Sequence, residues 1–104
     1  MPAAATDWYA LSAEVEQRAI EHLSRVEGVD ALGRRPGAVG ELALVVVMPE
    51  YDLPLCERVT AIGDQLEASS SGVHVDISFA AHHGRPVSRW LERPLWVRAG
   101  LDES

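Results

Sequence analysis

The chain has 104 residues, of which 47% are hydrophobic, and its formal net charge is −7. That length predicts one domain with a modest core. The acidic charge argues against a nucleic-acid partner, because affinity for phosphates depends on Lys and Arg.

Several other features of the sequence bear on where the protein works. The lone Cys56 excludes a disulfide within the chain, and all nine basic residues are Arg, which indicates a high-GC genome. Residues 1–10 lack the basic start and the apolar run of a signal peptide. The longest apolar run, residues 42–48, is too short to span a membrane. These features predict a cytoplasmic protein.

The first third of the chain predicts a helix followed by a short strand. Residues 1–10 are Ala-rich and predict a frayed N-terminal segment, after which Ser12 is a plausible helix cap. Apolar residues then recur at helical spacing up to Gly28, which ends the helix: Val15, Ala19, Ile20, Leu23 and Val26. Residues 29–35 predict a short strand that turns at Pro36-Gly37 into the next strand.

The central part of the chain predicts a βαβ unit. Residues 42–48 are apolar without interruption, as in a strand that is covered on both faces. Asp52 can cap a helix over residues 53–68, and Pro54 fits its first turn. Residues 73–79 alternate between apolar and polar, which is typical of a half-buried strand.

These elements predict a single α+β domain over residues 11–81. The expected architecture is a two-layer α-β-β-α-β sandwich, a small three-stranded sheet with two helices on one face. The other face of that sheet would expose Ala43, Val45 and Val47. We expect such an apolar patch to be buried by self-association or under the C-terminal tail.

The C-terminal tail, residues 82–104, has a different composition from the rest of the chain. Arginines recur there at about helical spacing between two tryptophans, and together they form the predicted contact element: Arg85, Arg89, Trp90, Arg93, Trp96 and Arg98. Arg and Trp are enriched at binding hot spots, and the pair also suits a peripheral membrane contact. The alternative is that Trp90, Leu91 and Trp96 fold back on the open sheet face.

The order and the joints of these elements resemble the bacterial alkaline shock protein family, also called Gls-type envelope stress response proteins. Residues 12–29 resemble the opening helix of that family, which closes in V-x-G-V, here Val26-Glu27-Gly28-Val29. Residues 42–59 resemble its valine-rich strand and P-I-x-E-V helix start, and residues 72–79 resemble its closing strand. The sequence departs from the family at Asp52, where a Gly is usual, in a shortened hairpin, and in the Arg/Trp tail.

The resemblance implies a non-enzymatic protein that self-associates and works at the inner face of the cell envelope, often through a membrane-anchored partner. A second family with a similar layout is the KH-type RNA-binding domain. Its Gly-x-x-Gly loop is missing here, and the acidic charge opposes RNA binding.

No stretch of the sequence carries a strong catalytic signature, so we expect no enzyme activity, no cofactor and no metal. The alternative is a small metal- or ligand-binding domain or enzyme. Its candidate residues lie on one strand face and in the loop that follows: His74, Asp76, His82 and His83. A metal site needs three or four such ligands to converge.

Overall fold

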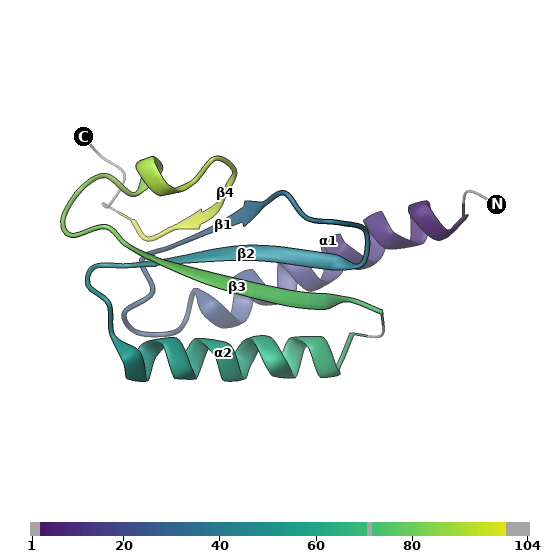
Figure 1. Ribbon diagram of the computed structural model, residues 1–104, viewed down its shortest axis with the longest axis horizontal. Helices are drawn as coiled ribbons and strands as arrows, with labels where there is room; N and C mark the ends of the chain where they lie inside the picture. The colour runs from purple at the N-terminus through teal and green to yellow at the C-terminus, as the bar shows by residue number, and fades with distance from the viewer. Residues whose placement is uncertain (1–2, 71, 100–104) are drawn as a thin grey trace.

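The computed structural model describes residues 3–70 and 72–99, and Figure 1 shows their arrangement. Two α-helices, one short 3-10 helix and four strands follow one another along the chain. In order they are α1 (Ala3–Leu23), β1 (Ala31–Arg35), β2 (Glu41–Met48), α2 (Leu53–Ala68), β3 (His74–Ala81), η1 (Val87–Trp90) and β4 (Pro94–Val97).

The strands form one mixed sheet in the order β3-β2-β1-β4. β2 and β3 are parallel and α2 connects them, while β1 is antiparallel to both of its neighbours. The α+β class and the βαβ unit are confirmed, but the expected sheet of three strands is wrong. The tail supplies the fourth strand, which lies beside β1 at the margin of the sheet (Figure 1). Pro94 is tolerated there because it is the first residue of an edge strand.

The N-terminal helix is longer than the sequence predicts. α1 begins at Ala3, so it replaces the frayed segment expected over residues 3–10. Ser12 lies inside the helix instead of capping it, and its hydroxyl donates to the carbonyl of Tyr9 at 3.2 Å. Ala has the highest helix propensity, and Trp8 is buried in the main core. Both effects favour an earlier start.

The main core lies between the two helices and one face of the sheet. Every second residue of β2 points to this face. These residues pack with Val15, Leu23, Val59 and Leu66 from the helices. Ile62 and Phe79 are only partly buried against it.

The opposite face of the sheet is covered by the tail. Val45 and Val47 form a second buried cluster with Ala31 of β1 and with Val87 and Leu91 from the tail. Ala43, Val45 and Val47 are exposed by only 7%, 8% and 0%, so this apolar patch is buried within one chain and is not the free interaction surface that self-association would use. Val45 and Val47 lie under the tail, the second of the two expected covers. The alternative, in which the tail folds back on the sheet, is confirmed for Leu91.

Close approach of the tail to the sheet depends on a glycine. A Cβ atom at Gly33 would lie 2.5 Å from Cδ2 of Leu91 and 3.2 Å from Cγ1 of Val45. Because no side chain stands at this position of β1, Leu91 can reach the floor of the second cluster.

The main core gives a first prediction. Leu44, exposed by 1%, lies in the middle of β2, whereas Leu53, exposed by 70%, begins α2. Leu44→Ala should lower the free energy of unfolding by about 2–5 kcal/mol because it removes buried methyl groups and leaves a cavity. The same substitution at Leu53 should change it by less than about 0.5 kcal/mol. Urea unfolding followed by circular dichroism measures both, and equal effects would contradict the described core.

Candidate interaction groove

The tail residues singled out in the sequence divide into two groups. Arg85, Arg89, Trp90 and Arg93 are exposed, as a contact element requires. Trp96 is instead half-buried and packs against the main core on the helix side of the sheet. Arg98 forms an ion pair with Asp30 and has a structural task, described below.

A groove of about 670 Å³ opens on the sheet face between the tail and the loop that follows β2. Its lining includes polar and aromatic residues of four separate segments: Arg35, Tyr51, Ser78, His83, Arg89 and Trp90. Trp90 retains 41% of its surface and Tyr51 retains 67%. The groove is therefore the place where the exposed part of the tail meets the part of the sheet that the tail leaves uncovered.

The side chains of the groove are positioned by strand alternation and by two hydrogen bonds. Arg35 is two residues after Gly33 in β1 and so points to the same face of the sheet. Its Nη1 donates to Oγ of Ser78 in β3 at 3.2 Å. Tyr51 follows the end of β2, and its hydroxyl donates to the carbonyl of Phe79 at 3.3 Å. Each bond joins a groove residue to the edge strand β3.

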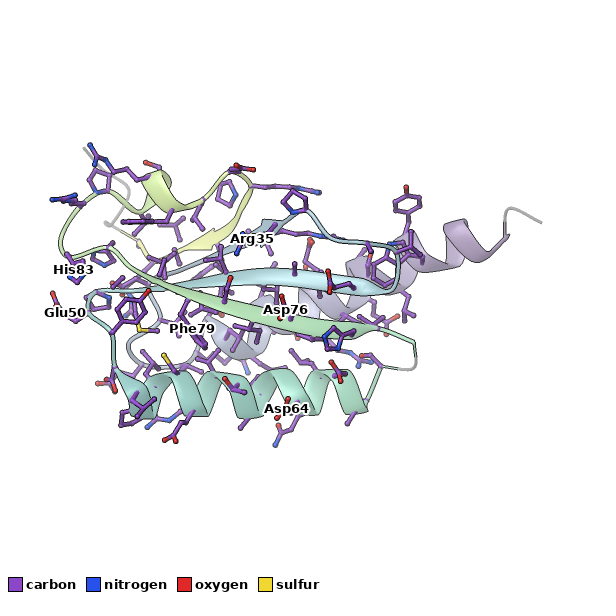
Figure 2. All side chains as sticks on the ribbon, viewed as in Figure 1. Arg35, Glu50, Asp64, Asp76, Phe79 and His83 are labelled. Atoms are coloured by element: carbon purple, nitrogen blue, oxygen red, sulfur yellow. The ribbon has the colours of Figure 1, made fainter. Side chains whose placement is uncertain are left out.

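The groove carries positive charge on an acidic protein. Within residues 3–70 and 72–99, neither Arg35 nor Arg89 forms an ion pair with a carboxylate. Glu92 is the acidic residue of the lining, and Glu50 lies at the rim beside His83, 3.4 Å from its Nδ1. Figure 2 shows Glu50 and His83 together at one end of the sheet and Arg35 on the sheet itself.

The residues named for the alternative function, a metal- or ligand-binding site, are not brought together. His74 lies 2.8 Å from Glu67, His82 lies 2.7 Å from Asp30, and His83 pairs with Glu50. Among the described residues, no group of three or more His, Cys, Asp and Glu side chains is placed to hold a metal ion. The structure therefore contradicts a site that combines His74, Asp76, His82 and His83.

A buried polar network near the groove was not expected from the sequence. Asp30, just before β1, accepts a hydrogen bond from Nε2 of His82 at 2.7 Å and forms an ion pair with Nε of Arg98 at 3.1 Å. Nη2 of Arg98 also donates to the carbonyl of Val29 at 2.7 Å. The three side chains thus join the start of β1, the end of β3 and the residue after β4. No local pattern could have revealed this contact, since its members are far apart in the sequence.

The contacts of His82 hold three segments of the chain together. The backbone N–H of Gly84 donates to Nδ1 of His82 at 3.0 Å, so Nδ1 carries no proton. Nε2, the other ring nitrogen, faces Asp30 as the donor. A general base needs a free nitrogen lone pair within reach of a substrate. Both ring nitrogens of His82 are occupied, and its side chain is exposed by only 7%.

Comparison of the sequence with protein-family models, with curated proteins and with solved structures finds no match. The resemblance to the alkaline shock protein family therefore stays a prediction. Within the described residues, no helix combines the length and the apolar character needed to cross a membrane.

Proposed function

We propose that the chain is a non-enzymatic interaction protein whose groove on the sheet face binds a segment of a partner protein. One observation carries the proposal: Trp90 and Tyr51 stay exposed around a concave surface that also presents the guanidinium groups of Arg35 and Arg89, which form no ion pair among the described residues. Trp, Tyr and Arg are the residue types in which binding hot spots are most enriched. Such a surface fits an acidic segment with an apolar side chain.

A protein segment fits this surface better than a membrane or a nucleic acid does. Membrane insertion needs apolar side chains that protrude, whereas Trp90 lines a hollow and is more than half covered. The net charge of −7 repels anionic lipid headgroups and nucleic-acid phosphates over a large area. A short peptide meets only the local positive charge of the groove.

The resemblance supplies the proposed setting of this interaction. We place the protein in the cytoplasm at the inner face of the membrane, within the envelope stress response, with a membrane-anchored protein as the partner. Self-association rests on the resemblance alone, because Ala43, Val45 and Val47 are buried within one chain.

Charge reversal in the groove tests the proposal. We expect Arg89→Glu to weaken binding of an acidic peptide by about tenfold or more, as loss of a hot-spot residue does. The probe is a short fluorescein-labelled peptide in which one tryptophan is flanked by glutamates, and fluorescence anisotropy measures its dissociation constant. Arg58→Glu, on the exposed side of α2, makes the same charge change outside the groove.

Comparison of the two arginine variants decides the result. A loss with Arg89→Glu and little change with Arg58→Glu supports binding in the groove. Equal losses would show that the peptide responds only to net charge, and no binding to the unsubstituted protein would contradict the proposal. Trp90→Ala, which removes an exposed ring without changing charge, should also weaken binding.

A further inference from the structure

A second hollow, of about 760 Å³, lies beside the end of β1 and the turn that follows it. Its lining also includes Tyr9, Ser12 and Glu16 of α1 and Arg93 of the tail. Tyr9 is exposed by 70%, although Ser12, one turn on in the same helix, is buried. Nothing in the proposed function uses this exposed ring.

The two hollows are neighbours that share part of their lining. Arg34, Arg35, Pro36 and Glu92 line both, so the hollows meet at the end of β1. At this shared lining the backbone N–H of Arg34 donates to the carbonyl of Arg93 at 2.9 Å. The guanidinium of Arg34 is in turn 2.8 Å from the carboxylate of Glu16. These two contacts fix the position of Arg34 between the hollows.

We propose that the two hollows together form one channel for an extended acidic segment of the partner, with one apolar side chain at Trp90 and a second at Tyr9. The proposal deepens the proposed function and rests on it. It commits to a protein segment in extended conformation as the occupant.

Charge and shape both favour that occupant. The lining of the two hollows contains four arginines and two glutamates, in contrast to the acidic balance of the whole chain. Arg93, like Arg35 and Arg89, forms no ion pair within the part of the chain that the structure describes. One extended segment can span two neighbouring hollows. Carboxylates along that segment would meet the guanidinium groups of these arginines, and its apolar side chains would meet the exposed rings.

A series of peptides of increasing length tests the inference. Each peptide keeps the tryptophan and the flanking glutamates of the short probe and adds a second tryptophan after a spacer of Gly, Ser and Glu. We expect one range of spacer lengths to bind about tenfold more tightly than the short probe, a difference of about 1.4 kcal/mol. Shorter spacers should give no gain, because each extended residue spans only about 3.3–3.6 Å.

Tyr9 provides the matched variants. Tyr9→Ala should abolish the gain from the second tryptophan and leave binding of the short probe unchanged, whereas Tyr9→Phe should keep most of the gain. Because Tyr9 is exposed, both variants should melt like the unsubstituted protein. Thermal melts followed by circular dichroism check this.

The outcomes separate this inference from the proposed function. If the short probe binds but no spacer length adds affinity, or if Tyr9→Ala leaves the gain intact, the channel is wrong and the groove stands. If the short probe does not bind, the proposed function itself fails. If single-stranded oligothymidine binds more tightly than the best peptide, the channel is a nucleic-acid site and the acidic protein segment is excluded.

Discussion

Removal of residues 85–104 is expected to cost the protein its cooperative fold. The shortened chain loses Val87 and Leu91, which cover Val45 and Val47 of the sheet. It also loses β4, whose Trp96 packs against the main core. Each fully buried apolar side chain contributes about 1.5–3 kcal/mol, so their loss approaches the total stability of about 5–15 kcal/mol for a small domain. We expect a weak, non-cooperative melt by circular dichroism and strong binding of the dye ANS.

Two controls show whether the loss of stability comes from the residues that cover the sheet or from shortening the chain as such. Truncation after Ala99 keeps β4 and Arg98 and should leave a cooperative melt. Val87→Asp puts a carboxylate at a position exposed by 0% and should lower the melting temperature strongly, while Ser88→Asp, at an exposed position next to it, should not. A protein truncated after Gly84 that melts at the original temperature would show that the tail contributes nothing to the core.

The central elements could be predicted from the sequence because their signals are local. α2 spans Leu53–Ala68, the predicted range, and the side chain of Asp52 accepts from the backbone N–H of Leu55 at 3.2 Å as a helix cap should. β2 and β3 begin or end within two residues of their predicted limits. Capping, the position of Pro54 and the apolar period are properties of neighbouring residues, so one sequence suffices to find them.

The fourth strand could not be predicted, because what stabilises it is not local. Pro94 and the short length of residues 94–97 argue against a strand when the segment is considered alone. Its partner, β1, lies more than half the chain away, and the register includes an irregularity between Leu32 and Gly33. Only the assembled sheet offers β4 a hydrogen-bonding partner.

The candidate site could be predicted in composition but not in detail. A tail rich in Arg and Trp indicated a contact element, and Arg89 and Trp90 do line the groove. Trp96 and Arg98 belong to the same Arg/Trp pattern, but Trp96 packs against the main core and Arg98 pairs with a buried carboxylate. Tyr51 was not predicted as a contact residue, since nothing in the sequence distinguishes it from other aromatic residues that follow a strand. Which Arg and Trp residues of the tail stay exposed depends on how β4 pairs with β1.

The second large effect is expected at His82. Its side chain is exposed by 7%, and the Asp30 carboxylate that it faces is exposed by 11%. Replacing the imidazole with a methyl group removes one hydrogen bond from a buried carboxylate and leaves a polar cavity beside it. The backbone N–H of Gly84 also loses its acceptor. Loss of one partner from a buried, hydrogen-bonded charge usually costs about 3–5 kcal/mol.

His83 provides a control at the adjacent position. Its imidazole lies 3.4 Å from a carboxylate of Glu50, but the two side chains are exposed by 55% and 74%. Such solvent-exposed pairs contribute about 0–1 kcal/mol because water screens the charges. We therefore expect His82→Ala to lower the free energy of unfolding by about 3–5 kcal/mol, and His83→Ala by less than about 1 kcal/mol. Urea unfolding of the two variants measures the difference.

A double-mutant cycle shows whether the effect of His82 comes from its bond to Asp30. Asp30→Ala leaves the N–H of His82 and the guanidinium of Arg98 without their shared acceptor, so it should destabilise at least as much as His82→Ala. The double variant should then be less destabilised than the sum of the single variants, with a coupling of about 0.5–3 kcal/mol. If the two destabilisations simply add, the loss of stability in His82→Ala comes from the cavity and not from the bond to Asp30. Equal effects of His82→Ala and His83→Ala would mean that the network does not hold the end of β3 to β1 and to the tail.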